Sequence, residues 1–394
     1  MDFKWGGYLM HIVDLPTPII LVDLKRLENN IKRAAEYAKK HRKTLWPMIK
    51  THKSTYIAKL QRKYGSEGFL CGTIDEAETL VERGLTKTVM LAYPVADKEN
   101  LRRVVNIVEN GARVIIRIDN KENARFVNDT IKEYGLSLDY VIKIDSGMHR
   151  LGVPPEMVVD FVKSLERYKR LNFVGIATHP GQAYAATTPE EVKKVAKEVA
   201  KTMEHALRDL ENAGYSLEIV GTGSTPTFKH DVEMDVYTHL FPGNYVYYDR
   251  FQVKFMGSAT FNDCALTVLA TVISIPEHSG GKLAIINVGS KYLGLDRAAH
   301  GGDIVRNYGY IVEHPKAKIF ALSEEIGKVD ISEEPEIQLG EKINIIPNHA
   351  CVVGNSTSYL VGHKGGRVEK VIEVDMRNGT RILRTLLSAF ISEV

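Results

Sequence analysis

Between Thr44 and about Tyr245, short apolar runs rich in β-branched residues alternate with longer stretches in which apolar residues recur at helical spacing. The short runs predict strands at Thr44–Ile49, Phe69–Cys71, Thr88–Leu91, Arg113–Ile118, Tyr140–Ile144, Phe173–Thr178, Glu218–Gly221 and Thr238–Tyr245. The longer stretches predict helices at Ile74–Arg83, Lys98–Glu109, Ala124–Tyr134, Pro155–Leu165 and Pro189–Ala213. Eight strands with helical crossovers predict an α/β fold, the (β/α)8 TIM barrel, whose active site lies at the carboxyl ends of the strands.

After about Phe251 the pattern changes to strands that are separated by turns rather than by helices. These strands are expected at Val253–Gly257, Ala265–Ile275, Leu283–Val288, Asp303–Val312, Lys316–Leu322, Lys342–Ile346, Ser358–Val361 and Val368–Asp375. They predict an all-β C-terminal domain, followed by a helix at Thr380–Phe390. We therefore expect an N-terminal segment at 1–16, a barrel at 17–252 and a β-domain at 253–394. The strand at 19–22 can join the β-domain, because the barrel has its eight strands without it.

The overall composition gives no indication of a nucleic-acid or membrane partner. Lysine and arginine total 52 against 49 acidic residues, a net charge of +3, and no run of about 18 apolar residues could span a bilayer. Three cysteines form no disulfide framework. The start of the chain, Met1–Val13, lacks the apolar core of a signal peptide. We expect a protein of a reducing compartment, the cytoplasm, that acts on a small molecule.

Lys50, at the end of the first predicted strand, is the first candidate for chemistry. A lysine with a partly desolvated amine can form a Schiff base with a carbonyl cofactor. The ordinary alternative is a solvated lysine in a loop, which is the commoner situation for a lysine. The loops after the seventh and eighth strands, Gly221–Thr227 and Pro242–Tyr245, favour the first interpretation. They contain glycines and hydroxyl side chains, which cradle phosphate at this position of the barrel, although such loops are also common as plain turns.

A strand-end lysine opposite a phosphate loop is the arrangement of a barrel that holds pyridoxal phosphate. His179 follows the sixth strand and could lie against the cofactor ring, or it could be a hydrogen-bonded strand-end histidine. Arg150 follows the fifth strand and could reach the cofactor oxygen or a substrate carboxylate, or it could form a salt bridge at the barrel mouth.

A second candidate site lies far from Lys50 in the sequence, in the segment Ile346–Cys351. His349 and Cys351 are two residues apart, so in a strand they would point to the same face. Both are good ligands for zinc or a similar ion, with the remaining positions left to water or substrate. The alternative is a buried cysteine and a hydrogen-bonded histidine in the core of the β-domain.

At this point several motifs resemble a known family. The chain is similar to the D-threonine aldolase and D-serine dehydratase group, fold-type III pyridoxal-phosphate enzymes with the fold of alanine racemase. The similarity covers nearly the whole chain and rests on the segments 47–53, 75–78, 145–152, 289–291, 323–325 and 347–351.

The resemblance implies that Lys50 is the Schiff-base lysine and that His349 and Cys351 bind a divalent metal, zinc or manganese. It implies a homodimer and a D-amino acid substrate. Candidate catalytic residues are then Lys50, His52 and Gln182, where His52 either touches the substrate or supports residues that do. The candidate cofactor-binding residues are Lys50, Arg150, His179, Tyr184, Gly223, Ser224, Thr225, Gly243, Asn244 and Tyr245.

Four positions depart from the pattern of the family. Met48, Gln182 and Ile326 stand where relatives commonly carry histidine, and Trp46 stands where they commonly carry arginine. We expect these positions near the substrate end of the site, so they bear on the identity of the substrate more than on the cofactor.

The main hypothesis is a metal-assisted lyase for β-hydroxy D-amino acids. Removal of the α-proton by Lys50 would give dehydration to a keto acid and ammonia, whereas deprotonation of the hydroxyl would give glycine and an aldehyde. The glutamine at 182 weakens the second route, so we favour the dehydratase over the aldolase. An amino-acid racemase, with Tyr308 or Tyr310 as its second acid–base group, is one alternative. A non-catalytic carrier of pyridoxal phosphate is another, but the β-domain argues against it.

Overall fold

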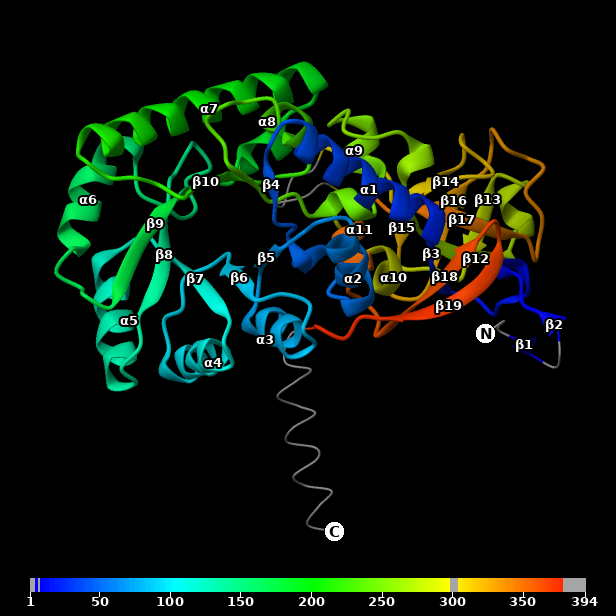
Figure 1. The fold of residues 1–394 in the computed structure, drawn as a ribbon. Helices are drawn as coiled ribbons and strands as arrows, with labels where there is room; N and C mark the ends of the chain where they lie inside the picture. Colours follow the sequence, from blue (N-terminus) through cyan, green and yellow to red (C-terminus); the bar gives the residue numbers. More distant parts are fainter. Residues whose placement is uncertain (1–3, 6–7, 298–303, 378–394) are drawn as a thin grey trace, which may run out of the picture. The chain divides into compact units, whose positions relative to one another are not determined.

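The computed structural model describes residues 4–5, 8–297 and 304–377 (Figure 1). It divides into two compact units, each described here by itself. Of the described residues, the barrel unit comprises those within 32–183, 190–243 and 375–377. The sheet unit comprises the described residues within 4–31, 184–189 and 244–374.

The barrel unit contains an eight-stranded parallel sheet in the spatial order β4-β11-β10-β9-β8-β7-β6-β5. A parallel bridge between Met48 and Leu70 connects the two ends of this order, and the Leu70 N–H donates to the Pro47 carbonyl at 3.0 Å. The predicted (β/α)8 barrel is therefore confirmed. The strands are β4 (Thr44–Leu45), β5 (Gly68–Cys71), β6 (Thr88–Leu91), β7 (Arg113–Ile118), β8 (Leu138–Lys143), β9 (Leu171–Ala177), β10 (Ile219–Thr222) and β11 (His239–Leu240).

Helices follow most of these strands, and in Figure 1 α5, α6 and α7 lie along the outside of the sheet. The chain enters the barrel unit through α1 (Leu24–Lys40). The others are α2 (Thr55–Lys63), α3 (Ile74–Glu82), α4 (Lys98–Glu109), α5 (Lys121–Glu133), α6 (Val158–Leu165), α7 (Pro189–Asn212) and α8 (Phe228–Asp231).

Three of the helices begin at a polar residue that caps the first turn. The side chains of Thr73, Asp97 and Asn120 each accept a hydrogen bond from the backbone N–H three residues later. Such caps satisfy helix N–H groups that have no partner within the helix. The chain can therefore turn from strand to helix within a few residues, which keeps the loops at the carboxyl ends of the strands short.

The interior of the barrel is filled by one cluster of buried side chains, to which every strand or its extension contributes. Its members are Trp46, Met48, Leu70, Met90, Ile115, Val141, Ala177, Ile219 and Phe241. Because alternate residues of a strand share a face, the next interior position along each strand lies one layer closer to the carboxyl ends. This packed layer is the floor on which the candidate site is built.

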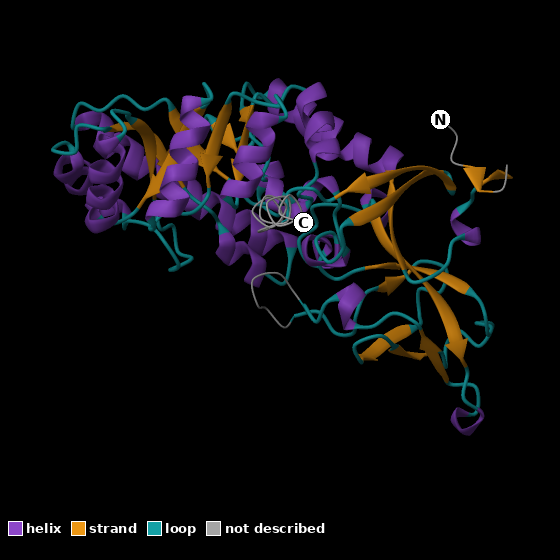
Figure 2. Cartoon of the chain, turned by 90° about the horizontal axis from the view of Figure 1, so that it is seen from below, coloured by secondary structure: helices purple, strands orange, loops and turns teal. Residues whose placement is uncertain are grey.

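The described part of the sheet unit contains one nine-stranded sheet, whose strands are drawn in orange in Figure 2 together with all other strands. They run in the order β15-β16-β13-β12-β3-β18-β19, and β17 pairs with both β12 and β14. The strand expected at 19–22 is β3 (Ile19–Asp23), which pairs antiparallel with β12 and parallel with β18. The others are β12 (Leu266–Ser274), β13 (Leu283–Ile286), β14 (Tyr310–Ile311), β15 (Lys318–Leu322), β16 (Gly327–Asp330), β17 (Lys342–Ile346), β18 (Tyr359–Lys364) and β19 (Arg367–Glu373), and β1 (Lys4–Trp5) and β2 (Tyr8–Leu9) form a separate hairpin.

Several details of this unit differ from the sequence-based expectation. Of the strand expected at Asp303–Val312, the described part forms only the short β14 at Tyr310–Ile311. The strand expected at Val253–Gly257 is wrong: the segment Arg250–Lys254 is a short helix, α9, which begins because the Asp249 side chain accepts a hydrogen bond from the Gln252 N–H. The strand β16 was not expected. The helix expected at Thr380–Phe390 lies outside the described residues. Two further short helices are α10 (Ser290–Leu293) and α11 (Ala350–Val353).

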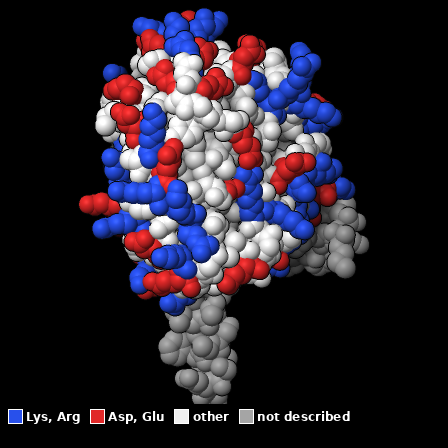
Figure 3. All heavy atoms as spheres, turned by 60° about the vertical axis from the view of Figure 1, so that its left-hand side comes forward, with Lys and Arg blue, Asp and Glu red and all other residues white. Residues whose placement is uncertain are grey.

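The charged side chains show no large patch of one sign on the face drawn in Figure 3, where lysine and arginine are interspersed with aspartate and glutamate. This agrees with the small net charge. Among the described helices, none has both the length and the apolar character that crossing a membrane requires.

Candidate active site

Two buried basic side chains lie one layer above the floor of the barrel. Arg117 on β7 and Lys143 on β8 each follow a core residue, Ile115 and Val141, by two positions and therefore share its interior face. Arg117 is 4% exposed, and its Nε has no hydrogen-bond partner within the described chain. Burial, together with the charges of Arg117 and Arg150, lowers the pKa of Lys143 to about 7. A bound anion would stabilise this buried positive charge.

Lys50 lies at the same end of the barrel, in a single 3₁₀ turn that spans Ile49–Thr51. Ile49 and Thr51 are fully buried and fix the backbone, whereas Lys50 is partly exposed. Gly72, which directly follows β5, lies beside it: a Cβ atom at Gly72 would be only 3.3 Å from the Cβ of Lys50. The glycine therefore leaves room for the stem of the lysine.

A buried ion pair connects the segment that follows Lys50 with the end of β5. Glu76 Oε1 lies 2.9 Å from Lys53 Nζ, and Glu76 Oε2 accepts a hydrogen bond from the Gly72 N–H at 2.5 Å. Burial raises the pKa of Glu76, although Lys53 and these hydrogen bonds act against the shift. One carboxylate thus joins the segment that follows Lys50 to the end of β5.

His52, a candidate catalytic residue, is completely buried. Its Nδ1 accepts a hydrogen bond from the Ser54 N–H at 3.1 Å. Burial lowers its pKa to about 3, so the imidazole is neutral at physiological pH. A neutral, enclosed ring of this kind can fix the turn that carries Lys50.

The candidate phosphate loop after β10 is organised by a chain of hydroxyl groups. Ser224 Oγ lies 2.9 Å from Thr227 Oγ1, which donates a hydrogen bond to Asp231 Oδ2 at 2.6 Å. Ser224 and Thr225 are both buried, at 4% and 3% exposure. Burial raises the pKa of Asp231 to about 8, although Thr227 acts against it.

The glycines of the two loops are required by close packing. A Cβ atom at Gly223 would lie 2.5 Å from the Cβ of Phe241, and one at Gly243 would lie 3.0 Å from Thr51 Oγ1. Gly243 thus lies against the turn that carries Lys50. His179 is bonded through Nδ1 to the carbonyl of Gly223, which places its ring beside the same loop.

The loop after β8 carries the two remaining candidates of the barrel unit. Asp145 accepts hydrogen bonds from the N–H groups of Gly147 and His149, which shapes the turn before the exposed Arg150. The Gln182 amide donates from Nε2 to the Ser146 carbonyl at 2.7 Å. Gln182 is therefore engaged by this loop, and an amide at this position supplies no proton acceptor of useful basicity.

The other candidate cofactor-binding residues belong to the sheet unit. Tyr184 stacks on Phe251 with a centroid distance of 6.1 Å and an interplanar angle of 8°. Tyr245 is fully buried. Asn244 donates from Nδ2 to Asp249 Oδ2 at 2.7 Å and to Cys351 Sγ at 3.4 Å.

His349 and Cys351 interact directly, but not in the way expected. They do not lie in a strand, because β17 ends at Ile346 and the chain turns into α11, for which His349 is the N-cap residue. Nδ1 of His349 lies 2.6 Å from Asp296 Oδ2. Burial lowers the pKa of His349, but Cys351 and Asp296 outweigh burial and raise it to about 10.

This arrangement suits a metal ion. A metal-binding histidine usually donates its second ring N–H to a carboxylate, which fixes the ring and raises its basicity. Asp296 makes such a contact with Nδ1, so Nε2 is the nitrogen available to a metal beside the Cys351 sulfur. His349 and Cys351 are adjacent, as expected. They lie at the N-terminus of α11, however, and not in a strand.

Trp46 is not at the substrate end, contrary to expectation. Its indole ring packs at 4.6 Å against His239, and a Cβ atom at Gly68 would lie 2.6 Å from it. His239 and Gly68 are the first residues of β11 and β5, so Trp46 lies at the amino end of the barrel, opposite the mouth. The presence of tryptophan at position 46, where relatives commonly carry arginine, therefore affects the packing of the barrel core.

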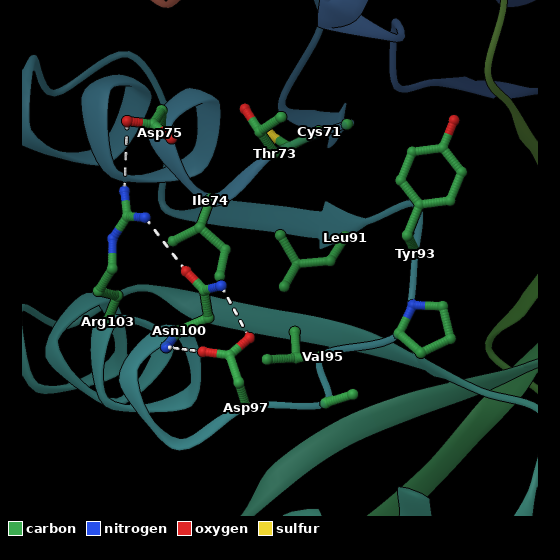
Figure 4. A pocket seen from close by; sticks show the side chains of 13 residues that line it. Cys71, Thr73, Ile74, Asp75, Leu91, Tyr93, Val95, Asp97, Asn100 and Arg103 are labelled. Carbon is green, nitrogen blue, oxygen red and sulfur yellow. Dashed lines mark hydrogen bonds and ion pairs between the residues drawn. The ribbon is translucent and has the colours of Figure 1, made fainter. Parts of the chain in front are cut away.

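A cavity of about 450 Å³ opens at the carboxyl ends of β5 and β6 (Figure 4). Cys71, Gly72 and Leu91 line it, so it adjoins the strand end beside Lys50. Arg103 at its wall is bound by Glu78, with a shortest distance of 2.6 Å, and by Asp75 at 3.4 Å. The guanidinium is thus compensated within the protein, and the cavity supplies space rather than charge.

Pyridoxal phosphate fits the residues of the barrel unit. Arg117 and Lys143 provide buried positive charge that the described chain does not neutralise fully, and a phosphorylated cofactor is an anion. The hydroxyl groups of Ser224 and Thr225 lie in a glycine-containing loop at the same end, and Lys50 supplies the amine. Arg117, Lys143 and Asp296 were missed by the sequence analysis. A charged residue at an interior-facing position of an apolar strand signals the first two, whereas Asp296 has no local signal.

Comparison with known proteins supports a shared fold with several lyases. The chain is 29% identical to D-serine dehydratase of Dictyostelium discoideum over 86% of this chain and 91% of that protein. It is 26% identical to D-threonine aldolase of Arthrobacter sp, over 93% of both chains. The solved structure of D-threo-3-hydroxyaspartate dehydratase from Delftia sp. HT23 matches with a TM-score of 0.84 and 26% identity, covering 92% of this chain and 98% of that one. A cysteine-to-alanine variant of that enzyme, described as metal-free, matches equally well.

Two family models cover most of the sequence. Residues 265–362 match the model described as "Putative serine dehydratase domain". Residues 22–250, more than half of the chain, match the model described as alanine racemase, N-terminal domain. The parallel barrel, the strand-end lysine and these matches agree, and the chain belongs to the family of the alanine racemase N-terminal domain.

Proposed function

We propose that this protein is a pyridoxal-phosphate-dependent lyase that acts on β-hydroxy D-amino acids. The observation that carries the proposal is the position of Lys50 at the same barrel end as the buried basic side chains Arg117 and Lys143. The names of the relatives, which are a D-serine dehydratase, a D-threonine aldolase and a D-threo-3-hydroxyaspartate dehydratase, support the reaction class. When bound, pyridoxal phosphate accepts the electron pair of the bond that is broken at the substrate Cα.

Each residue of the barrel mouth has a role in this proposal. Lys50 would hold the cofactor aldehyde through its amine, and the same amine is the base that would take the proton from the substrate Cα. Gly223, Ser224, Thr225 and Gly243 bind the phosphate. His179, which is bonded to the Gly223 carbonyl, would lie against the cofactor ring, and Arg150 would bind the cofactor oxygen or the substrate carboxylate. Tyr184, Asn244 and Tyr245 are proposed as further cofactor-binding residues, and His52 keeps the Lys50 turn in place.

His349 and Cys351 are proposed to hold a divalent metal ion, zinc or manganese. The ion supplies a Lewis acid for the β-hydroxyl group of the substrate. Support comes from Asp296, which holds the imidazole by Nδ1, and from Asn244, which donates a hydrogen bond to the Cys351 sulfur. A sulfur that accepts such a bond is suited to the thiolate form, the form that binds metals.

Dehydration is favoured over aldol cleavage. Aldol cleavage requires a base that removes the proton of the β-hydroxyl, and Gln182 offers an amide whose nitrogen is already bonded to Ser146. Dehydration requires only removal of the α-proton, which Lys50 can perform, and departure of hydroxide. The expected products are a keto acid and ammonia. The protein is further proposed to work as a homodimer in the cytoplasm; its three cysteines, all in described segments, form no disulfide.

A substrate screen tests the proposal. Purified protein loaded with pyridoxal phosphate is incubated with D-serine, D-threonine and D-threo-3-hydroxyaspartate, with the L-enantiomers as controls, before and after treatment with chelator. We expect keto acid and ammonia in equal amounts from at least one D-substrate, and loss of turnover on chelation. Glycine and an aldehyde as the products would assign the aldolase reaction. Turnover unchanged after complete metal removal would rule out the metal, and interconversion of enantiomers alone would identify a racemase.

A further inference from the structure

A histidine with three carboxylates lies in the sheet unit, apart from the residues assigned to catalysis. His314 lies in the loop between β14 and β15, and Glu334, Glu336 and Glu341 lie in the loop between β16 and β17. His314 Nδ1 is 3.5 Å from a Glu336 oxygen and 3.9 Å from a Glu334 oxygen. Its other nitrogen, Nε2, is 2.6 Å from Glu341 Oε1.

The His314 side chain is about nine-tenths buried, and Nδ1 is aimed at the two carboxylates without a hydrogen bond. Nε2 is well placed to donate to Glu341, and Nδ1 faces Glu334 and Glu336. This is the arrangement that orients histidine ligands in metal sites. Buried polar atoms are nearly always paired, so an unpaired ring nitrogen beside carboxylates indicates a missing partner of positive charge.

Within the part of the chain that the structure describes, no lysine or arginine side chain neutralises these carboxylates. There, no lysine or arginine forms an ion pair with Glu334, Glu336 or Glu341. Three carboxylates therefore share one imidazole, which leaves the cluster negative even when the imidazole is protonated. Like charges so close together favour a bound cation.

The distances between the ligand atoms suit a small transition-metal ion. A histidine nitrogen and one carboxylate oxygen from each of Glu334 and Glu336 all lie within 4.8 Å of one another. Ligands of tetrahedral zinc, about 2.0–2.2 Å from the ion, lie about 3.3–3.6 Å apart. A shift of a few tenths of an ångström at His314 and Glu334, and a rotation of the exposed Glu336, would complete three ligands.

Hydrogen bonds at the edges of the cluster hold its carboxylates in place. The Lys316 N–H donates to Glu334 Oε1 at 2.9 Å, and the Gln338 N–H donates to Glu341 Oε2 at 3.0 Å. In each carboxylate the other oxygen is the one that lies nearer to His314. The ligands are positioned before any ion arrives, which lowers the entropic cost of binding.

We propose that His314, Glu334 and Glu336 form a second divalent-metal site, which binds zinc and links the β14–β15 loop to the β16–β17 loop. One nitrogen and two carboxylate oxygens leave the fourth position to water. Such a site has a structural role, because it joins two loops of the sheet unit and includes none of the residues assigned to catalysis. It is independent of the metal proposed at His349 and Cys351.

Zinc stoichiometry tests this site. The holoenzyme is stripped with chelator and dialysed against zinc, and bound zinc is counted by mass spectrometry in a His349→Ala/Cys351→Ser background, which removes the other proposed site. We expect one zinc per chain in this background. Adding Glu336→Ala, which removes an exposed side chain and leaves the fold intact, should weaken zinc binding at least tenfold in calorimetric titration and abolish the rise in melting temperature caused by zinc.

Glu333→Ala is the matched control, because Glu333 lies in the same loop but pairs with Lys318 at 2.7 Å. It should bind zinc as the background variant does. Absence of bound zinc in the background variant, or equal affinity in the Glu336→Ala and Glu333→Ala variants, would overturn the proposal. A wild-type protein that binds a single zinc, lost only with Glu336→Ala, would support this site and count against the metal at His349 and Cys351.

Discussion

Asp296 Oδ2 lies 2.6 Å from Nδ1 of His349, although the two residues are 53 positions apart in the sequence. The contact occupies Nδ1 and so leaves Nε2 as the second nitrogen of the ring. A carboxylate that accepts a hydrogen bond from Nδ1–H fixes both the orientation and the tautomer of the ring, so Nε2 is presented for metal binding.

Replacing Asp296 with asparagine should weaken metal binding at His349 and Cys351. The amide keeps the size of the side chain but loses the charge that stabilises the ring proton, and loss of such a partner typically costs roughly 10–100-fold in metal affinity. Competition with a chelating dye measures the affinity. Glu190→Gln, at the start of α7 in the other unit, is the control. An Asp296→Asn protein with unchanged metal affinity would show that this contact serves only the fold.

Replacing Lys50 with alanine should remove the visible absorption band of the lysine-bound cofactor and reduce turnover by roughly 10³-fold or more, because Lys50 is the amine proposed to hold the aldehyde. Absorption spectra and product formation from D-serine measure the two effects. Lys59→Ala, which changes an exposed residue of α2, should retain both band and activity. A Lys50→Ala protein that keeps the band would mean that another lysine carries the cofactor.

Replacing Glu76 with glutamine should destabilise the barrel unit. The oxygen of the introduced amide could still accept from Gly72, but the ammonium of Lys53, only 11% exposed at its side chain, would lose its counter-ion. Removing one partner of a buried ion pair costs roughly 3–5 kcal/mol. Urea unfolding measures the loss. The double variant Lys53→Met/Glu76→Gln should lose less than the sum of the single changes, and strict additivity would show that the two residues do not interact.

Replacing Asp231 with asparagine should change how stability depends on pH. Burial raises the pKa of Asp231 to about 8 in the folded protein, whereas in the unfolded chain the carboxyl group has its ordinary pKa of about 3.8. Between these values the folded state binds more protons, so this group lowers stability as pH rises, by at most about 1.4 kcal/mol per pH unit. Asparagine cannot ionise, so the stability of the variant should not show this decrease as the pH rises.

Melting temperatures of both proteins between pH 4.5 and 9 measure the difference. Asp235→Asn, at an exposed position nearby, should follow the wild-type curve. Parallel curves for wild type and Asp231→Asn would mean that Asp231 is ionised in the folded protein.

The barrel and the place of Lys50 could be predicted from the sequence because both depend on local patterns. Strand runs, helix spacing and caps such as Thr73 are read from neighbouring residues, and the fold rule then assigns strand ends to the active site. The start of α9 could not be read in this way, because Val253–Gly257 is apolar enough for a strand. Its first turn depends instead on the Asp249 cap.

The rest of the site depends on contacts between distant segments. Asp296 has no sequence feature that marks it as the partner of His349. The same holds for His314 and Glu334, which lie 20 positions apart on different loops and meet only because β14 and β15 pair with other strands. Arg117 could have been found, since it occupies the same face of its strand as Ile115, where charge is unusual.

The strand β3 is synthesised long before the strands that pair with it. Ile20, Leu21 and Val22 are almost completely buried between β12 and β18, yet the first residue of β12, Leu266, follows Asp23 by 243 residues. At a synthesis rate of roughly 5–20 residues per second, this apolar strand waits roughly 12–50 s for its neighbours. During that interval the barrel can form without it, whereas β3 remains an unpaired strand that a ribosome-bound chaperone would have to shield from aggregation.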